Sequence, residues 1–586
     1  MHFQDSLPKM PIPALDKTLE RFVYFAQPLL EDDDELLLAQ RAAFAFARQE
    51  GPQLQAELLE ADKGTYTSYI SQPWFEMYLR DRSPLLLNFN PQLTFQDEQA
   101  PTSQTNRAAR LCHSAGLFLK TLEKGVLEPD IFHTAPKKSK HPLWPEVIRL
   151  LPRSIAFYGA AATGAYALDM SQYANLFRST RVPQLGRDEL CSVADSRHIL
   201  VQRGGAMWTV ELFDEAGNTV PTAQLQGALD AIVSSPGSAA DKPGVGFLTG
   251  LPRDEWATLR ASLASADGTN SLALRAIDEA VFALCLDDTA PEELGAVNRA
   301  MLHGKGTDRW LDKSFQLIVT ANAKAAINFE HSWGDGVAVL RFANEIYDYS
   351  VGMPTSESPA PHKTMPKELK FVLPPPLAES VNDAAKRFDA TICGTQLATV
   401  MADHFTTGAL KRAGVSPDGM MQMAFQLAMA KLRGTTVSTY ESASTAAFKH
   451  GRTETIRSAT PESRAFTEAF CNGSEPISRK AALMRAAVRN HTRVTRDAMT
   501  GNGMDRHLFV LAQMAKERGL KPAIFESAAY HKLSKIIIST STLSSHALAN
   551  GGFGPFHPDC FAVGYAIRPD VSGAQASCCH LLTSPS

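Results

Sequence analysis

Apolar and polar positions repeat with two different periods along this chain. Residues 13–60 and 378–405 carry apolar side chains at helical spacing, as in ALDKTLERFVYFAQPLL, and predict long amphipathic helices. Residues 314–332 contain two β-rich runs on either side of a polar TANAK segment, which predicts a β-hairpin. His331 then lies at the end of the second strand, where the sequence WGDG turns the chain away.

The pattern breaks most clearly in residues 351–377, where prolines and small polar residues predict a linker or a surface excursion. At 586 residues the chain is too long for one hydrophobic core, so we expect two domains. We place the boundary near residue 370, with an N-terminal domain in residues 1–370 and a C-terminal domain in residues 371–586.

The composition is that of an ordinary soluble globular protein, with 44% hydrophobic and 20% charged residues. A formal net charge of −4 provides no field that would recruit nucleic acid, and we find no nucleic-acid-binding motif. The 8 cysteines have no paired CxxC spacing, which argues against a zinc site or a disulfide framework and for a reducing compartment. We therefore expect no metal site and no nucleic-acid partner.

One apolar tract, residues 145–170, has two interpretations. Its uncharged run from Ser154 to Leu168 is shorter than the roughly 20 residues that span a bilayer. The tract is then either an Ala-rich segment of the core or a patch on a membrane surface. In the second case, arginines upstream would face lipid headgroups while Phe157 and Tyr158 would insert between them.

His331 is the first candidate for catalysis, because an unperturbed imidazole exchanges protons near neutral pH. Asp335, four residues later, can orient the imidazole if the chain turns at Gly334. Alternatively, Asp335 fixes the turn itself, and His331 is a packed structural residue. A metal hydrolase that uses the same pair is a further alternative, but the chain has no HExxH-like cluster.

Three further stretches carry polar groups suited to binding. Residues 436–460 are rich in hydroxyls, and they either bind a small polar substrate or form a solvated strand. Within residues 531–555, a run of isoleucines leads into Ser, Thr, Ser and Thr, and hydroxyls at a strand end suit an oxyanion donor. In residues 410–419, Lys411 and Arg412 precede the helix-start signal SPD, an arrangement that suits a phosphate group.

Taken in order, the segments EHSWGDG, TYESAST…GRTETIRS and STSTLSS resemble the carnitine/choline acyltransferase family, and the similarity extends to about residue 568. The resemblance implies an α/β fold of two chloramphenicol-acetyltransferase-like domains with mixed sheets and an active-site tunnel at their interface. It also implies acyl transfer between coenzyme A and carnitine by general-base catalysis, as in mitochondrial fatty acid β-oxidation. Coenzyme A and carnitine would be the substrates, and no cofactor is expected.

The resemblance assigns a role to each candidate residue. His331 would be the general base, Asp335 would orient its imidazole, and Ser541 would donate a hydrogen bond to the oxyanion. The carnitine carboxylate would bind to a second group, which consists of Tyr440, Ser442, Thr453 and Arg506. Thr453 and Thr455 in GRTETIRS favour carnitine over choline, because choline-specific members lack these threonines.

The resemblance places coenzyme A on residues 406–418, through Lys411, Arg412, Ser416 and Asp418. Thr407 departs from the family, which usually has a lysine there, so we expect weaker phosphate binding or compensation by Arg412. Gly551 stands where short-chain members have a methionine that blocks the acyl tunnel. An extended chain can then pass, and each buried methylene contributes about 0.8 kcal/mol, so palmitoyl-type acyl groups are expected.

Localisation also follows from the resemblance, which implies the matrix side of the mitochondrial inner membrane, with residues 145–170 as a membrane-associating insert. The chain has no recognisable transit peptide, and we expect it to act as a monomer. The tail, residues 571–586, does not match the ending expected for the family. An alternative function is therefore a catalytically weak or inactive acyl-CoA-binding variant that lacks the usual C-terminal segment.

Overall fold

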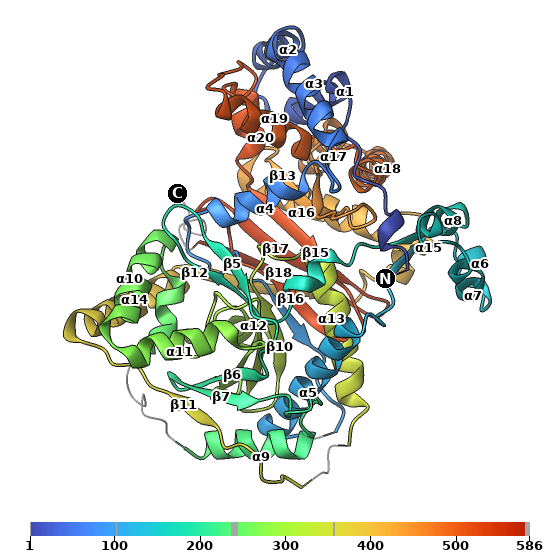
Figure 1. Cartoon of the computed structure of the whole chain (residues 1–586). Helices are drawn as coiled ribbons and strands as arrows, with labels where there is room; N and C mark the ends of the chain where they lie inside the picture. Colours follow the sequence, from blue (N-terminus) through green and yellow to red (C-terminus); the bar gives the residue numbers. More distant parts are fainter. Residues whose placement is uncertain (1, 101, 236–243, 355–357, 580–586) are drawn as a thin grey trace.

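Two mixed β-sheets form the centre of the computed structural model, which describes residues 2–100, 102–235, 244–354 and 358–579 (Figure 1). Among these residues the larger sheet has eight strands and the smaller has six. Both combine parallel and antiparallel neighbours, and helices cover them. The expected α/β fold class with mixed sheets is confirmed.

The larger sheet has a parallel centre, in which β8 pairs with β6 on one side and with β9 on the other. The remaining neighbours are antiparallel, and β9 and β10 form the predicted hairpin across TANAK. Across the sheet the strands are β11 (Lys367–Leu369), β7 (Ala206–Glu211), β6 (His198–Arg203), β8 (Ala283–Asp287), β9 (Phe315–Thr320), β10 (Ala325–Phe329), β1 (Gln92–Phe95) and β16 (Leu548–Gly552).

Both faces of this sheet are buried, and alternate residues of β9 show how. Leu317 belongs to the core that includes α5 (Gln104–Glu123), α9 (Thr222–Val233) and α13 (Gly336–Val351). Ile318 faces the other way, onto α12 (Leu294–Leu302). Since α12 also contacts β12 of the smaller sheet, it lies between the two sheets.

Most of the predicted hydroxyl-rich segments lie on strands of the smaller sheet. In this sheet β15 pairs in parallel with both β13 and β17. The helices α16 (Pro417–Arg433), α17 (Pro461–Cys471) and α18 (Ile477–Met499) pack against one another beside it. Across the sheet the strands are β12 (Thr395–Ala402), β18 (Ser572–Cys579), β17 (Phe561–Ile567), β15 (Ile538–Thr542), β13 (Thr439–Ser444) and β14 (Thr453–Ile456).

The first helices of the chain pack against the part of the molecule that the C-terminal residues form. The predicted amphipathic segment 13–60 forms three helices, whose apolar sides share a core with helices from the C-terminal part of the chain (Figure 1). The helices on either side of this core are α1 (Leu15–Ala26), α2 (Asp33–Arg48), α3 (Glu50–Lys63), α4 (Ser71–Arg80), α19 (Asp505–Glu517) and α20 (Ala528–Ser534).

The predicted domain boundary near residue 370 falls directly after β11, and all strands of the smaller sheet that the structure describes come after it. Two segments lie with the part of the chain on the other side of this boundary. Helices α1–α3 pack against C-terminal helices, and β16 joins the edge of the larger sheet. Gly564 of β17 permits the close approach of β16, because a Cβ there would lie 2.2 Å from the carbonyl oxygen of Gly551. The division into two domains stays a prediction.

The predicted helix over residues 378–405 was wrong in its second half. Helix α14 (Pro375–Cys393) ends before Gly394, and Thr395–Ala402 form β12 instead. Here β12 pairs along its whole length with β18, so sheet pairing overrides the helical period. Strand β18 lies between β12 and β17 and takes up residues 572–579 of the tail that we described as atypical. Residues 580–586 lie outside the described residues.

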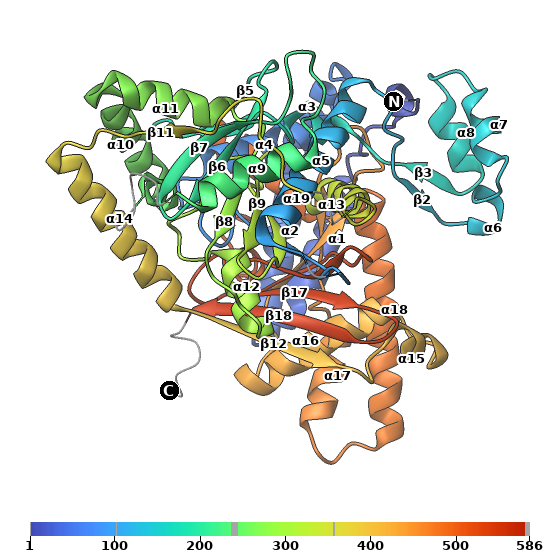
Figure 2. The ribbon, with the colours of Figure 1, turned by 90° about the horizontal axis from the view of Figure 1, so that it is seen from below.

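A small unit projects from the body beside the N-terminus (Figures 1 and 2). It pairs β2 (Ile131–His133) with β3 (Ala165–Ala167) and carries three short helices, α6 (Pro136–Ser139), α7 (Trp144–Arg149) and α8 (Ala156–Ala162). The other elements are η1 (Gln4–Ser6), η2 (Gln27–Leu29), η3 (Ser171–Asn175), η4 (Val245–Gly250), β4 (Ser179–Val182), β5 (Glu189–Ser192), α10 (Arg253–Ala266), α11 (Gly268–Glu279) and α15 (Thr407–Arg412). No helix of the described residues is long and apolar enough to cross a membrane.

Candidate active site

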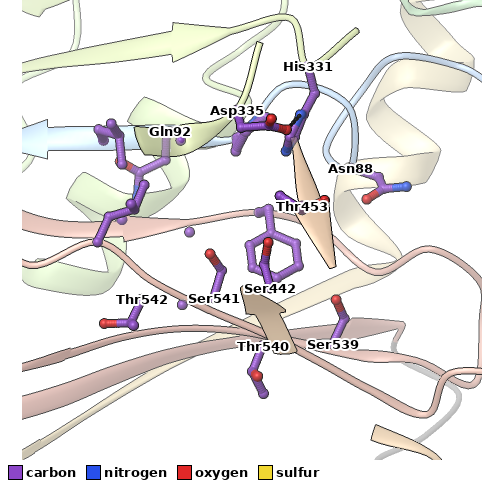
Figure 3. A pocket seen from close by; sticks show the side chains of 18 of the residues that line it. Asn88, Gln92, His331, Asp335, Ser442, Thr453, Ser539, Thr540, Ser541 and Thr542 are labelled. Atoms are coloured by element: carbon purple, nitrogen blue, oxygen red, sulfur yellow. Dashed lines mark ion pairs between the residues drawn. The ribbon is translucent and has the colours of Figure 1, made fainter. Parts of the chain in front are cut away.

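A cavity of about 260 Å³ lies where the two sheets meet (Figure 3). Strands β1 and β16 of the larger sheet line one side, and β13, β14, β15 and β17 of the smaller sheet line the other. Of the predicted residues, the cavity brings together His331, Asp335, Tyr440, Ser442, Thr453, Ser541 and Gly551.

His331 enters this cavity from the turn after β10. Its backbone N–H donates to the carbonyl of Phe89 at 3.0 Å, which ties the turn to the segment before β1. The ring of Tyr78 stacks on the imidazole, with the centroids 5.5 Å apart and the planes 13° apart. The side chain is 28% exposed, so the imidazole is held on one face and open to the cavity on another.

Asp335 is the N-cap residue of α13, and one of its carboxylate oxygens faces the imidazole. Oδ1 lies 4.0 Å from Nδ1 of His331, which is beyond hydrogen-bond distance, and neither atom has a hydrogen-bond partner among the described residues. Oδ2 accepts from Nε of Arg452 at 2.7 Å and from Nε2 of Gln172 at 3.0 Å. The orienting role of Asp335 stays a prediction, and this arrangement leaves Oδ1 available for it.

Arg452 and Gln172 hold the turn together, although neither was a candidate in the sequence. Arg452 donates to the carbonyls of His331, at 3.1 Å, and Ser332, at 2.9 Å. The side-chain oxygen of Gln172 accepts from the backbone N–H of Asp335 at 2.8 Å. Arg452 stands inside the GRTETIRS segment and could have been found there, whereas nothing in the local sequence distinguishes Gln172.

The residues predicted to bind a carboxylate gather at one end of the cavity. The hydroxyls of Tyr440 and Thr453 both accept from Nη2 of Arg506, at 3.2 and 3.1 Å, and Ser442 lines the cavity beside them. Arg506 itself is 4% exposed and is not among the residues that line the cavity. It also lies 3.6 Å from the ring centroid of Trp74, a cation–π contact. Its charge therefore reaches the cavity through the two hydroxyls.

Glu454 lies behind this end of the cavity and is fully buried. Its carboxylate accepts from the backbone N–H of Thr455 at 2.7 Å and, more weakly, from that of Arg506 at 3.4 Å. Burial raises the pKa of Glu454 to about 7, although the charge of Arg506 opposes the shift. A buried acid thus lies next to the buried cation.

Ser541 lies on β15, opposite Gly564 of β17 and across the cavity from His331 (Figure 3). The neighbouring hydroxyl of Thr540 points away and donates to the carbonyl of Tyr440 at 3.0 Å. Since successive residues of a strand face opposite sides, Ser541 presents its hydroxyl to the cavity while Thr540 joins strands. The hydroxyl of Ser541 therefore faces the cavity, and its role as an oxyanion donor stays a prediction.

The residues predicted for coenzyme A divide into two sets. Lys411 and Arg412 are exposed at the end of α15, and Ser416 caps α16 by accepting from the N–H of Gly419 at 3.2 Å. None of them lines the cavity. Asp418 turns inward instead and accepts from the hydroxyl of Tyr565, a cavity residue, at 2.6 Å.

Asp418 belongs to a polar cluster with Glu441, His491 and Tyr565. Nε2 of His491 lies 2.9 Å from Glu441, and Tyr565 lies 3.1 Å from the other oxygen of that carboxylate. Burial raises the pKa of Glu441; the pKa of His491 is raised by that carboxylate, although burial opposes the change. The described residues of this cluster are close enough for a metal ion, but they already satisfy one another by hydrogen bonds.

Gly551 lines the cavity at the end formed by β16. It faces Leu93 of β1, and a Cβ at this position would lie 3.0 Å from the Leu93 side chain and 3.2 Å from the carbonyl of Gln92. A larger side chain would therefore crowd this wall. Phe553 and Phe556 add apolar surface to the same end.

Comparison with known proteins places the chain in one family. The choline/carnitine O-acyltransferase family model matches residues 10–584. The chain is 41% identical over 590 residues to mitochondrial carnitine O-palmitoyltransferase 2 of Xenopus tropicalis and 42% identical over 592 residues to the Homo sapiens protein of that name. Each alignment covers 98% of this chain and 89% of the relative. The muscle isoform of Homo sapiens carnitine O-palmitoyltransferase 1 is 29% identical, with 96% of this chain and 72% of the relative covered.

Proposed function

Because this chain belongs to the choline/carnitine O-acyltransferase family, we propose that it transfers long-chain acyl groups between coenzyme A and carnitine in mitochondrial fatty acid oxidation. The observation that carries the mechanism is the convergence of His331, Ser541 and the Tyr440–Thr453 hydroxyls on one cavity. A base, an oxyanion donor and an alcohol-binding end are the parts that this acyl transfer requires.

The first step is proton abstraction. Nδ1 of His331 faces Asp335, so Nε2 takes the proton of the carnitine hydroxyl. The carnitine oxygen attacks the thioester carbonyl at the same time, and general-base catalysis of this kind contributes about 10² to 10⁴-fold. Asp335 stabilises the imidazolium that forms, while Arg452 and Gln172 fix the position of the carboxylate.

The second step is collapse of the tetrahedral intermediate. Ser541 donates a hydrogen bond to the oxyanion while the negative charge is on oxygen. The carbonyl then re-forms, the carbon–sulfur bond breaks, and the imidazolium returns its proton to the coenzyme A thiolate. The reverse reaction begins with deprotonation of the thiol by the same imidazole. These steps use only side chains of the chain, and we propose no resident metal or cofactor.

Specificity for carnitine over choline rests on charge. The carnitine carboxylate would accept from Tyr440, Ser442 and Thr453, two of which already accept from Arg506. A buried guanidinium polarises these hydroxyls and favours an anion at this end. Choline has no carboxylate, so the positive charge of Arg506 does not stabilise its binding. Lys411 and Arg412 supply the positive charge for the coenzyme A phosphates, and Ser416 and Asp418 lie at the start of the next helix, α16.

The alternative of an inactive acyl-CoA-binding variant is not favoured. The family model matches residues 10–584, and the carnitine O-palmitoyltransferase 2 relatives align over 98% of this chain. Within the described tail, β18 is hydrogen-bonded to a neighbouring strand on each edge. The second sheet is therefore built with this tail as a central strand.

The direct test is a thiol-release assay with palmitoyl-CoA, with and without L-carnitine. We expect turnover that depends on carnitine and falls at least 10³-fold in His331→Ala, because the base is lost. His531→Ala is the matched control, since His531 is exposed on α20 and lies neither in the cavity lining nor in residues 406–418. Release that does not depend on carnitine, or an active His331→Ala variant, would overturn the proposal.

We further propose that the chain works as a monomer on the matrix side of the mitochondrial inner membrane. The projecting unit of residues 131–167 supports membrane docking, because it exposes large apolar side chains next to lysines and arginines. These side chains are Leu143 (63% exposed), Val147 (60%), Leu150 (85%), Ile155 (49%) and Tyr158 (57%). Phe157 is buried in the small core of this unit, so its predicted insertion into lipid was wrong.

Flotation with vesicles of phosphatidylcholine and cardiolipin tests the docking surface. We expect the double variant Val147→Ser/Leu150→Ser to float less than the unmodified chain, because it removes most of the exposed apolar surface of α7 and its end. Leu272→Ser is the matched control, because Leu272 is 69% exposed on α11 in the body of the protein. Equal flotation of all three proteins would contradict membrane docking, and sedimentation equilibrium would test the monomer.

A further inference from the structure

The guanidinium of Arg181 connects two segments that hold the imidazole of His331. Arg181 is on β4, is 1% exposed and is not among the residues that line the cavity. Its Nη1 donates to Oε1 of Glu330 at 2.9 Å, and its Nη2 donates to the carbonyl of Tyr78 at 2.5 Å. Glu330 directly precedes His331 in the chain, and the ring of Tyr78 stacks on the imidazole. One buried side chain therefore contacts both the segment that carries the imidazole and the segment that carries its stacking partner.

The carboxylate of Glu330 folds back onto the turn that contains His331. Oε1 accepts from the backbone N–H of Ser332 at 3.0 Å, and Oε2 accepts from the hydroxyl of Ser332 at 2.5 Å. The backbone N–H of Glu330 donates to the carbonyl of Ser314 at 3.0 Å. Glu330 and Ser332 are both 0% exposed, so these bonds are shielded from water. The residues before and after His331 are thus fixed by one carboxylate, which Arg181 binds.

Tyr78 lies in the last turn of α4, where the carbonyls lack partners one turn further along the helix. The backbone N–H of Asp81 donates to the carbonyl of Tyr78 at 3.3 Å, and the guanidinium of Arg181 adds the shorter bond. A positive charge at this position also interacts favourably with the negative end of the helix dipole. Arg181 therefore holds the end of α4 from which the ring of Tyr78 reaches His331.

Arg181 is itself held by a buried carboxylate. Its Nε donates to Oδ2 of Asp188 at 2.7 Å, and the same oxygen accepts from Nε of Arg253 at 2.7 Å. The backbone N–H of Asp188 donates to the carbonyl of Leu79 at 2.8 Å, so Asp188 also contacts the end of α4. Arg253 and Asp188 are both 0% exposed. The planar guanidinium of Arg181 thus makes bonds in three fixed directions, which a lysine ammonium cannot reproduce.

We propose that Arg181 is a positioning residue for the acyl transfer, because it fixes His331 and the ring of Tyr78 relative to each other through Glu330 and the end of α4. This inference rests on the proposed function and adds to it a residue outside the cavity. A general base must lie within hydrogen-bond distance of the hydroxyl whose proton it takes. A misplacement of about 1 Å can lower a rate about 10²-fold.

Steady-state kinetics of Arg181→Lys tests the proposal, with palmitoyl-CoA and L-carnitine each varied in turn. Lysine keeps the charge but loses the geometry. We expect kcat to fall about 10²-fold and both KM values to stay within about threefold of the unmodified chain, because the base is displaced while the binding residues remain. Glu330→Gln is the second variant, in case Arg181→Lys does not fold. It keeps the size of the side chain and removes its charge, so we expect kcat to fall about tenfold.

Arg110→Lys is the matched control. Arg110 is also 1% exposed and lies on α5, outside the cavity lining. It pairs with Glu98 and donates to the carbonyl of Ser350 at 2.8 Å. Its kcat should stay within about threefold of the unmodified chain, since distant sites act independently. Each kcat is measured well below the lowest Tm among the folded variants, so that unfolded protein does not contribute to the loss.

Labelling with diethyl pyrocarbonate gives a second readout that does not require turnover. The reagent acylates accessible neutral imidazoles, and peptide mass spectrometry measures the rate at His331 separately. We expect His331 to be labelled about threefold faster in Arg181→Lys and in Glu330→Gln, because the ring of Tyr78 no longer covers one face of the imidazole. His531, which is exposed, should be labelled at the same rate in every variant. A loss of overall stability would not single out His331.

Two results would overturn the inference and leave the proposed acyl transfer standing. One is that kcat of the folded variants at Arg181 and Glu330 equals that of Arg110→Lys, or falls only together with a matching rise in both KM values. The other is that His331 is labelled at the same rate in all the proteins. Absence of carnitine-dependent turnover in the unmodified chain would instead contradict the proposed function, and the labelling rates then decide the inference.

Discussion

The two ends of the cavity solve the problem of burying polar groups in different ways. At the carnitine end, Tyr440 and Thr453 accept from a buried arginine, and a buried acid lies behind it. At the other end, Gln92 lines the cavity and its partners Thr94, Asn550 and Gln575 carry no charge. His331 and Ser541 line the same cavity.

Because of this difference, one cavity can discriminate strongly between substrates that do and do not carry a carboxylate, and only weakly between acyl chains. A charge fixed behind hydroxyls favours an anion strongly, since a charge-assisted hydrogen bond contributes about 1.5 to 3 kcal/mol. Neutral amides discriminate more weakly, by about tenfold for each bond. We therefore expect binding at the carnitine end to depend on pH and charge, and binding beside Gln92 not to depend on them.

The largest expected effect concerns Glu454 and the pH dependence of stability. Its pKa is about 7 in the folded chain and 4.5 when unperturbed, so the folded state holds the proton more tightly. Stability from this group is fully present below pH 4.5 and is lost as the pH rises through 7, by about 3 kcal/mol. Urea unfolding at pH 5 and pH 8 should show this loss in the unmodified chain and a smaller one in Glu454→Gln. An exposed control, Glu60→Gln, should retain the full difference.

Arg506→Gln comes next and tests whether charge defines the carnitine end. We expect the KM for carnitine to rise about 30-fold, because the hydroxyls lose their charged donor, while the KM for palmitoyl-CoA stays within twofold. Steady-state kinetics with each substrate varied in turn measures both values. Arg464→Gln, on the exposed side of α17, is the control. Parallel rises in both KM values would mean that the two ends are not independent.

Gln172→Leu has the smallest expected effect and addresses the region between the two ends. It removes one of the two bonds to Oδ2 of Asp335, so we expect kcat to fall about tenfold with both KM values unchanged. Gln4→Leu is the matched control, because Gln4 bonds to Leu168 and Met170 in the same region but not to Asp335. If the two variants lose activity equally, Gln172 supports only the local fold and does not position the carboxylate.

The elements that the sequence predicted well are those with a local period. The hairpin of β9 and β10, the helices α1–α3 and the start of α16 after Ser416 all follow from patterns within a few residues. Strand β12 was not predicted, because the local pattern of residues 395–402 is compatible with a helix and only the pairing with β18 makes the segment a strand. Pairing partners that lie 170 to 184 residues away leave no local signal.

The sequence alone determined which residue types could do the chemistry: an imidazole near a carboxylate, hydroxyls on strands, and the ordered segments typical of one family. Which of these residues come into contact depends on the tertiary structure. The fold places Arg506 behind the hydroxyls, brings Arg452 and Gln172 to Asp335, and joins β1, β16 and β18 around Gln92. The physical reason is that hydrogen bonds and ion pairs depend on distances in space, which the fold sets between residues far apart in the chain.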